Sequence, residues 1–561
     1  MKPLTSLGYS DFKSLREGKR YFVDKSLFIR DVIYGAETTL FARPRRFGKT
    51  LNMSMLRYFF DVNAGENAHL FEGLAIQSEA DIMAKQGKHP VIFLSFKDVK
   101  KTSWKDTFAH ISSLVRNEVQ NFLYLLDGEQ LTPKEANRLQ LLADGDAPQE
   151  EVAASLQFLS LLLTRYHQSK TVILLDEYDT PIHSSWLNGF YSQAIAFFRD
   201  FLSGALKDNP SLEKGALTGI LRVAKESIFS GLNNFDISTV LTVNEFSDKF
   251  GFTVPEVQKM LSDYGMNGRE WEEIENWYNG YRFGREVIFN PWSILNYVKA
   301  PDNGVQPYWV NTSDNAILKR LFFYGKANIM EDLDALLRGE KIAVEATDNV
   351  VFSDLDAKQN AVWTMLLFSG YLKFENPHRP EGSDAYDYDL SIPNREVRYC
   401  YREIIQNWLQ TDLQTSEHDL MLEYLTRGEL APFENYLRTF VEQVFSYHDT
   451  PKGMAENFYH AFLLGLFAKL EGRYAILSNR EAGYGRYDLC LIPKIPGKKG
   501  IVIEIKAPNE HRGETLETAI VAAEQQMQLN KYEAQLSAHG ITQVFRLAIA
   551  VQGKAFLVKE V

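Results

Sequence analysis

The sequence has 561 residues, which is too long for a single hydrophobic core and predicts about three to four domains at the usual ~150 residues each. Its 45% hydrophobic and 24% charged residues are typical of a globular protein, so the composition excludes a chain dominated by disorder. The net charge of -12 argues against a protein coated with nucleic acid, because phosphate contacts depend on Lys and Arg.

The cysteines and the apolar segments restrict the compartment in which the protein works. Cys400 and Cys490 are far apart and have no paired spacing, which argues against a disulfide framework or a zinc knuckle. The N-terminus lacks the apolar core of a signal peptide, and runs such as AFLLGLFAKL are far shorter than the ~20 residues that span a bilayer. We therefore expect a cytoplasmic protein without a membrane segment.

Strand and helix patterns alternate over residues 38–243. Apolar or β-branched runs recur there with helical segments between them, namely TTLFA, HPVIFLSF, TVILLD, GALTGIL and ISTVLTV. Strands separated by helices predict a mainly parallel sheet sandwiched between helices. Helical patterns prevail from about 245 to 450, and the C-terminal part returns to mixed α/β patterns. The sequence thus predicts an α/β multidomain protein with domains at 1–244, 245–450 and 451–561.

A phosphate-binding loop is predicted after the first of these strands. Such a loop needs backbone N–H groups facing the phosphates, a Lys for the β- and γ-oxygens, a Ser or Thr for Mg²⁺, and a following helix. The segment RPRRFGKT supplies Gly48, Lys49 and Thr50 directly before the helical pattern LNMSMLRYFF. Arg43 stands where the general pattern has its first Gly. The candidate nucleotide-binding residues are Arg43, Pro44, Arg45, Arg46, Phe47, Gly48, Lys49 and Thr50.

An acidic pair after a later strand completes this signature. The apolar run from Val172 to Leu175 ends in Asp176 and Glu177. A buried central strand would deliver Asp176 to organise Mg²⁺ and Glu177 to activate water at its carboxyl end. Either motif alone could be a chance loop or a strand meeting a polar turn. Their joint occurrence in one α/β region predicts binding of ATP or GTP, with Thr50 and Asp176 at the metal.

Two polar residues further along could sense the γ-phosphate. Thr218 lies in the next predicted strand, where its alternative role is simply that of a β-branched strand residue. Arg222 follows that strand and could act as an arginine finger, either within the chain or toward a neighbouring subunit of a homo-oligomer. Its alternative role is that of a solvated surface residue. The sequence leaves both pairs of alternatives open.

A metal-dependent phosphodiesterase site is predicted near the C-terminus. The strand pattern RYDLCLIP carries Asp488, and GIVIEIK places Glu504 and Lys506 on one face, because strand side chains repeat every two residues. The Pro/Gly-rich segment KIPGKKG between them predicts a hairpin that brings Asp488 near Glu504. Carboxylates suit Mg²⁺ or Mn²⁺, and Lys506 would stabilise the charge that develops on the phosphate.

Several segments together resemble a known family. They are YFVDKSLFI, RPRRFGKT, LLDEYDTPI, TGILRVAKESIFSGLNN, FGFTVPEV, WYNGYRFG, FNPWSILNY and SIPNREV. The chain resembles the AAA-ATPase-like proteins of bacteria and archaea, which usually end in a domain of the PD-(D/E)xK nuclease superfamily. The resemblance implies an additional-strand P-loop core, a helical or winged-helix-like middle and a restriction-endonuclease-like end. Arg43 agrees with the RPRRFGK form of that family.

Further residues of the C-terminal site follow from this resemblance. Glu456, on an amphipathic helix, matches an extra carboxylate ligand of some nucleases in the superfamily, or it is a charged surface residue. Gln528 and Tyr532 share a helical face four residues apart, as in other members. Gln526 matches the common glutamine position of the family. The choice between the two glutamines stays open.

Two classes of function are compatible with these motifs. In the first, the protein is an ATP-controlled, metal-dependent DNA endonuclease, serving defence against phage or mobile elements. In the second, it is a nucleotide-dependent switch or scaffold with a silent nuclease fold. The Asp, Glu and Lys of the C-terminal site favour the first class, and the net charge leaves the second open. Two local clusters of basic residues could contact phosphates: Arg43, Arg45, Arg46 and Lys49, and Lys494, Lys498, Lys499 and Lys506.

Overall fold

The computed structural model describes residues 2–62, 67–128, 130–222, 235–266, 268–309, 327–346, 359–380, 386–410, 415–444, 463, 466–482, 485–508, 514–530, 536, 539–552 and 555–561. The chain forms two compact units. Unit 1 comprises residues 1–311 and 343–396, and unit 2 comprises residues 312–342 and 397–561. The three domain boundaries expected from the sequence stay a prediction.

A parallel sheet is the centre of unit 1. Its described strands are β1 (Thr38–Ala42), β2 (Val91–Ser95), β3 (Thr171–Asp176), β4 (Leu212–Gly219) and β5 (Phe235–Ser238). They lie in the order β2-β3-β4-β1-β5, and every neighbouring pair is parallel. The parallel α/β sheet predicted for this part of the chain is therefore confirmed. The strand β4 lies between β1 and β3, as an additional-strand core requires.

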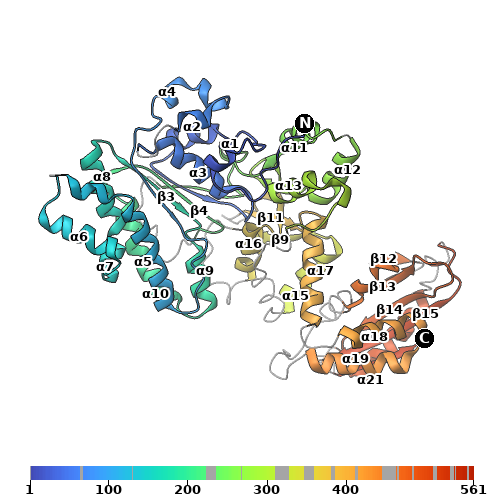
Figure 1. Ribbon diagram of the computed structural model, residues 1–561. Coiled ribbons are helices and arrows are strands. Elements are labelled where there is room, and N and C mark those ends of the chain that lie inside the picture. Colours follow the sequence, from blue (N-terminus) through green and yellow to red (C-terminus); the bar gives the residue numbers. More distant parts are fainter. Residues whose placement is uncertain are drawn as a thin grey trace. The chain divides into compact units, whose positions relative to one another are not determined.

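Helices enclose this sheet, which explains why its strands are apolar throughout. All residues of β1 and β3 are buried, as expected of parallel strands covered on both faces. Helices α1 to α3 lie on one side, and α5, α8 and α10 lie on the other (Figure 1). The helices of this region are α1 (Phe12–Glu17), α2 (Leu27–Tyr34), α3 (Lys49–Phe60), α4 (Ala80–Met83), α5 (Trp104–Gln120), α6 (Pro133–Asp144), α7 (Gln149–Ala153), α8 (Ser155–His167), α9 (Thr180–Leu187) and α10 (Tyr191–Leu206).

The middle of the chain contains helices and short strands. Its helices in unit 1 are α11 (Val254–Asp263), α12 (Gly268–Tyr278), α13 (Pro291–Lys299) and α16 (Gln359–Ser369). Its strands are β6 (Phe252–Thr253), β7 (Tyr281–Phe283), β8 (Glu286–Phe289), β9 (Ile342–Glu345), β10 (Lys373–His378) and β11 (Asp387–Ser391). The described strands form two small sheets, β6-β8-β7 and β10-β11-β9. Helices are present as expected, and the strands are an addition that the helical patterns did not indicate.

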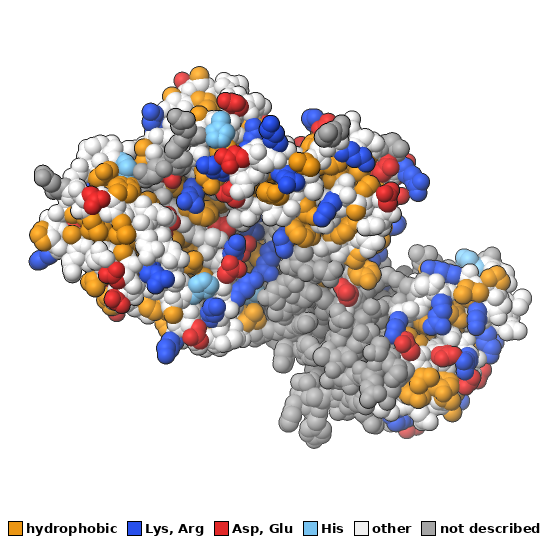
Figure 2. All heavy atoms as spheres, in the orientation of Figure 1, with side chains coloured by type: hydrophobic (Ala, Val, Ile, Leu, Met, Phe, Trp, Pro, Cys, Tyr) orange, Lys and Arg blue, Asp and Glu red, His pale blue; other side chains and the backbone are white. Residues whose placement is uncertain are grey.

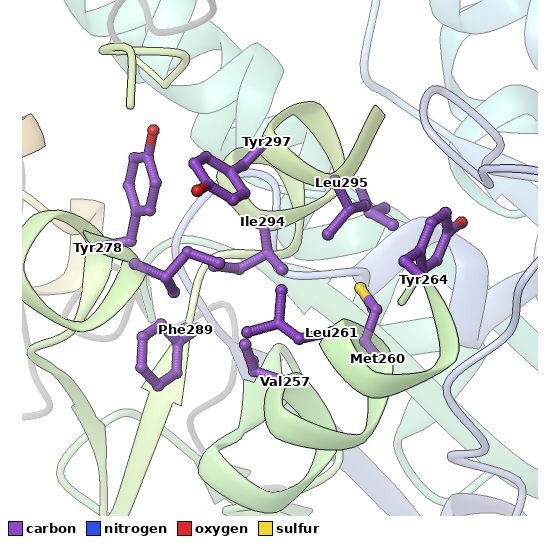
Figure 3. Packing of buried hydrophobic residues seen from close by; sticks show 11 residues of the cluster. Val257, Met260, Leu261, Tyr264, Tyr278, Phe289, Ile294, Leu295 and Tyr297 are labelled. Atoms are coloured by element: carbon purple, nitrogen blue, oxygen red, sulfur yellow. The ribbon is translucent and has the colours of Figure 1, made fainter. Parts of the chain in front are cut away.

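A separate apolar core holds α11, α12 and α13 together. Val257, Met260 and Leu261 of α11 pack against Ile294 and Leu295 of α13 (Figure 3). Tyr278, Phe289 and Tyr297 enlarge the same cluster, and all of these side chains are buried. Because so many contacts converge on α13, this helix is fixed within unit 1.

Unit 2 contains a mixed sheet. Its described strands are β12 (Tyr474–Ala482), β13 (Gly485–Pro493), β14 (Gly500–Lys506), β15 (Val544–Gln552) and β16 (Ala555–Glu560), in that order across the sheet. Only the β14–β15 pair among them is parallel. The accompanying helices are α15 (Ala327–Arg338), α17 (Arg395–Gln410), α18 (Thr415–Arg427), α19 (Leu430–Val444) and α21 (Leu516–Asn530). The predicted hairpin between β13 and β14 is confirmed.

The distribution of surface charge and the length of the apolar helices are relevant to nucleic-acid and membrane partners. Basic and acidic side chains are interspersed on the face drawn in Figure 2, in agreement with a net charge that is not basic. No helix in the described ranges is long and apolar enough to cross a membrane.

Candidate nucleotide and metal sites

The phosphate loop connects the central strand β1 to α3. Gly48 precedes α3 in a left-handed conformation, with φ of 85°, where a side chain would be strained. Lys49 begins the helix, is almost fully buried, and donates hydrogen bonds of 3.0 Å to the carbonyl oxygens of Arg43 and Pro44. Burial lowers the pKa of its ammonium, although Glu177 opposes that shift. The loop therefore holds a buried cation at the N-terminal end of a helix.

Arg43 has a different environment from the other arginines of this loop. Its guanidinium is fully buried and donates to the carbonyl of Ser238 at 2.7 Å and to the hydroxyl of Ser238 at 2.9 Å. The rings of Phe250 and Phe283 lie 5.2 Å from the guanidinium carbon. Burial lowers the pKa of Arg43 to about 9. Its side chain thus ties β1 to β5, and its backbone carbonyl is what faces Lys49.

The remaining loop residues divide into anchored and exposed positions. Phe47 is fully buried against Tyr281 and Phe283 of β7, with ring centroids 5.0 and 5.1 Å apart. Pro44 is also buried, and Arg45 is half-buried. Arg46 is exposed, has a positive φ of 71°, and places its guanidinium carbon 4.2 Å from the ring centroid of Trp292. The loop is therefore held at Phe47 and presents Arg46 to solvent.

The carboxylate of Asp176 accepts hydrogen bonds from three hydroxyl groups at the carboxyl edge of the sheet. Its Oδ2 accepts hydrogen bonds from Thr50 and from Ser95, both at 3.0 Å, and its Oδ1 accepts one from Thr218 at 2.6 Å. Its side chain is fully buried, and burial raises its pKa, whereas the Thr218 hydroxyl and Lys49 act in the opposite direction. The structure thus brings the hydroxyl of the phosphate loop to the acidic residue predicted to share its metal.

Glu177 lies beside this cluster with a strained backbone. Its φ is 51°, a conformation that non-glycine residues seldom adopt and that is frequent at active sites. The Thr218 hydroxyl accepts the Glu177 N–H at 3.1 Å, and Thr180 donates to Glu177 Oε2 at 3.3 Å. Thr218 therefore links Asp176 and Glu177 directly. Arg222 is half-buried beyond the end of β4.

Asp179 is a further carboxylate close to the phosphate loop. It is buried and accepts the N–H groups of Ile220 and Leu221 at 2.7 and 2.9 Å. Burial raises its pKa, and these hydrogen bonds oppose the shift. It also contributes to the electrostatic environment of Lys49. Asp179 thus fixes the chain where it leaves β4, immediately before Arg222.

The C-terminal candidates lie on paired strands. Leu489 of β13 is opposite Ile503 of β14, and the Asp488 carboxylate accepts the N–H of Ile505 at 2.7 Å. Glu504 is fully buried, and its Oε1 lies 3.4 Å from the ammonium of Lys506. A buried carboxylate is tolerated when cations compensate its charge. Lys506 supplies one such cation.

The buried core around β13 and β14 identifies the face of the sheet on which the candidate residues lie. Cys490 and Val502 pack in one cluster with Ala519, Ala523 and Met527 of α21. Because strand side chains alternate, Asp488 shares the face of Cys490, and Glu504 and Lys506 share that of Val502. All the candidate residues on the two strands therefore face the side covered by α21.

The two glutamines of α21 have different positions relative to this face. Gln526 is half-buried, whereas Gln528 is exposed. Glu524 pairs with Lys559 of β16 at 2.6 Å, and Gln526 flanks the buried stripe of α21 on the other side, toward β13 and β14. Which of the two glutamines acts at the site stays a prediction. Glu456 and Tyr532 lie outside the described residues, within which no three His, Cys, Asp or Glu side chains gather as a metal site.

The basic residues of the β13–β14 turn are remote from Lys506. Lys499 immediately precedes β14, and Lys506 ends it. A strand rises about 3.3 Å per residue, so the two side chains are separated by roughly 20 Å along the strand. Lys494, Lys498 and Lys499 are therefore not neighbours of the candidate catalytic lysine.

Known protein families account for both ends of the chain. Residues 6–229 match the family described as Predicted AAA-ATPase, and residues 454–561 match the PD-(D/E)XK nuclease superfamily. The chain carries an AAA-ATPase-like domain and a PD-(D/E)XK nuclease superfamily domain. It is also 26% identical over 506 residues to an uncharacterized protein in the vnfD 5' region of Azotobacter chroococcum mcd 1, covering 87% of this chain and 86% of that protein. Both domains expected from the sequence motifs are confirmed.

Ser95 and Asp179 contact or flank the candidate nucleotide site but do not belong to the residues predicted from the sequence. Ser95 ends β2 opposite Asp176, and Asp179 belongs to the segment LLDEYDTPI. The end of a predicted parallel strand was a usable signal for Ser95, because carboxyl ends of parallel strands meet at one edge. Asp179 lies in LLDEYDTPI, one of the segments that carry the family resemblance, and this position could have marked it as a site residue.

Proposed function

We propose that this protein is a metal-dependent DNA endonuclease whose activity is controlled by ATP. The observation that carries this proposal is the position of Asp488, Glu504 and Lys506 on adjacent strands and on one face of the nuclease-domain sheet. An ordinary strand edge would not bury a carboxylate such as Glu504 completely. The charge arrangement is that of a site for a cation and a phosphate.

In the AAA-ATPase-like domain, ATP is the proposed ligand of the phosphate loop. Lys49 would contact the phosphates, and Thr50 and Asp176 would hold Mg²⁺. The hydroxyls of Thr50 and Ser95 fit this role, because both already converge on one oxygen of Asp176. Glu177 is proposed to orient the attacking water. Its position is fixed by Thr218 and Thr180.

In the nuclease domain, Asp488 and Glu504 are proposed to hold Mg²⁺ or Mn²⁺. The metal ion would polarise the scissile phosphate and lower the pKa of the attacking water. Lys506 would stabilise the negative charge that develops on the phosphate oxygens. Its 3.4 Å contact with Glu504 supports this role, because it keeps the ammonium beside the metal site. Gln526 is proposed to contribute from α21.

Control by ATP is proposed because an unregulated nuclease in the cytoplasm would damage the genome of its own cell. Defence against phage or mobile elements is the proposed setting. Energetic coupling between two sites is reciprocal, so DNA should alter ATP affinity if ATP alters DNA affinity. Control by ATP can fail while the proposed ATP hydrolysis and DNA cleavage stand, since each domain could act without the other.

A cleavage assay with the full-length protein tests the proposal. Plasmid and linear DNA are incubated with Mg²⁺, Mn²⁺ or a chelator, each with and without ATP. We expect cleavage that requires the metal, disappears in Glu504→Gln and persists in Glu560→Gln, a matched change of an exposed carboxylate in the same sheet. ATP binding, followed by calorimetry, should be the same in all three proteins.

The outcomes separate the alternatives. Equal cleavage by wild type and Glu504→Gln would overturn the assignment of the nuclease site. A wild-type protein that binds ATP but cleaves neither DNA under any condition would instead be a nucleotide-dependent switch.

A further inference from the structure

Three segments that the proposed chemistry does not use meet in unit 1 at the start of α17. They are WYNGYRFG, FNPWSILNY and SIPNREV. Gly280 of the first has a φ of 130°, and a β-carbon there would lie 2.0 Å from the carbonyl oxygen of Pro393. Asn394 donates to the carbonyl of Tyr278 at 3.2 Å. The backbone before α17 is therefore pressed against the turn that follows α12, and only glycine permits this approach.

Glu396 lies at the centre of the contacts between these three segments, which we call the junction. Its carboxylate is fully buried and accepts hydrogen bonds from the Ser293 hydroxyl at 2.8 and 3.0 Å. It also accepts the backbone N–H of Trp309 at 2.8 Å. A buried carboxylate is costly unless it is hydrogen-bonded, so these contacts constrain one another tightly. Glu396 thus joins α13, the segment that follows α13 and the first two residues of α17, which still belong to unit 1.

The junction lies beside two of the three points at which the chain passes between the two units; the third is between residues 342 and 343. Unit 1 ends at Asn311 in one passage and at Glu396 in another. Trp309 precedes the first passage by two residues, and Glu396 is the last residue before the second. The same carboxylate therefore holds Trp309 and the start of α17, which lie beside two of the three connections to the unit that carries the nuclease domain.

The phosphate loop touches the same helix. The Arg46 guanidinium lies 4.2 Å from the ring of Trp292, which immediately precedes Ser293 in α13. The Trp292 indole N–H donates to the carbonyl of Tyr308 at 3.2 Å. The rest of α13 is fixed in the apolar core drawn in Figure 3. A change at Arg46 therefore acts on Trp292 and on its contact with residue 308 rather than moving the whole helix.

We propose that Arg46, Trp292 and Glu396 form the path by which nucleotide in the phosphate loop acts on two of the three connections to the nuclease-bearing unit, those that follow Trp309 and Glu396. This inference rests on the proposed function, because it assigns the route of its ATP control. A phosphate group draws the exposed Arg46 side chain through charge-assisted hydrogen bonds, which are stronger than a cation–π contact at a solvent-exposed site. Arg46 then leaves Trp292, and the bond from Trp292 to Tyr308 loosens beside the Trp309–Glu396 bond.

Amide hydrogen exchange of the full-length protein measures this effect without relying on DNA cleavage. The peptide that covers residues 304–309 is followed with and without a non-hydrolysable ATP analogue and Mg²⁺. We expect the analogue to accelerate exchange of this peptide several-fold in the wild type, because the Trp309 amide loses protection. In Trp292→Ala, exchange should be fast already and should not respond to the analogue.

Two further variants make the test specific. Trp271→Ala removes a tryptophan that packs on Phe289 in the same core, and it should keep the response to the analogue. Arg46→Lys lacks the planar group that stacks on an indole, so exchange of residues 304–309 should be fast without the analogue and should not respond to it. Because Arg46 also belongs to the phosphate loop, the analogue is added at a concentration at which calorimetry shows this variant to be saturated.

The results distinguish the inference from the proposed function. If calorimetry shows binding of the analogue but exchange of residues 304–309 is unchanged in the wild type, the path is overturned and the proposed nuclease stands. If the analogue does not bind, ATP control itself fails and the path fails with it. An unaltered response in Arg46→Lys would also overturn the path.

Discussion

Thr50 of the phosphate loop and Asp176 at the end of β3, separated by 126 positions in the sequence, are joined by a hydrogen bond of 3.0 Å. The same oxygen of Asp176 accepts the hydroxyl of Ser95 from the neighbouring strand β2. Elements from three parts of the sequence therefore converge at one carboxylate. This convergence gives the proposed Mg²⁺ site its oxygen ligands and suggests where substitutions should have their largest effects.

Lys49→Ala should weaken ATP binding by about tenfold or more, because a hydrogen bond to a charged group contributes roughly 1.5–3 kcal/mol. Calorimetric titration with ATP and Mg²⁺ measures the change. Lys170→Ala, which removes an exposed lysine at the opposite end of β3, is the matched control. Equal affinities of Lys49→Ala and the control would make the loop a structural turn.

Glu177→Gln should retain ATP binding and slow ATP hydrolysis by about 100-fold or more, the usual contribution of a general base. The amide keeps the size of the side chain and can still accept the hydrogen bond from Thr180, so the fold should be unaffected. Phosphate release during steady-state turnover is the measurement. Hydrolysis at the wild-type rate would show that another group activates the water.

Arg43→Met should lower the stability of unit 1 by about 3 kcal/mol, because it leaves the buried oxygens of Ser238 and the carbonyl of Phe246 without their donor. Denaturant unfolding followed by tryptophan fluorescence gives the difference. ATP affinity of the folded fraction should change little. A variant with wild-type stability and strongly reduced ATP affinity would instead place the guanidinium at the nucleotide.

Gln526→Ala should reduce metal-dependent DNA cleavage more than Gln528→Ala does. Gln526 flanks the side of α21 that faces β13 and β14, whereas Gln528 is exposed. Initial cleavage rates of the two variants on the same plasmid, compared at equal protein concentration, decide the question. A larger loss in Gln528→Ala would reverse the choice between the two residues.

Glu396→Gln should alter the pH dependence of stability. Burial raises the pKa of Glu396 to about 7, above its ordinary value of 4.5. Between these two values the carboxyl ionises in the unfolded chain but stays protonated in the folded protein, so this group makes the wild type less stable as the pH rises. The lost stability is about 3 kcal/mol at pH 7 and above.

The free energy of unfolding is therefore to be compared at pH 5 and pH 8. Relative to the wild type, Glu396→Gln should become more stable between these pH values, because its side chain does not ionise. Glu345→Gln, at an exposed position of the same unit, should show no such relative gain. A difference between wild type and Glu396→Gln that is independent of pH would contradict the raised pKa.

Local patterns in the sequence determined the strands and the motifs that they carry. The continuous apolar runs at 38–42 and 171–176 predicted buried parallel strands, because both faces of such a sheet are covered. The period of two and the Pro/Gly turn predicted that Asp488 and Glu504 share a hairpin. Each of these features depends on residues close together in the chain, so the sequence alone was sufficient.

Tertiary structure decided which distant residues meet. Ser95 reaches Asp176 only because β2 pairs with β3, and Arg43 turns into the protein because β5 and Phe246 offer it buried oxygens. The assembly of Ser293, Trp309 and Glu396 likewise joins segments that no local pattern connects. Such contacts arise from strand order and core packing, which depend on the whole chain and leave no spacing rule in the sequence.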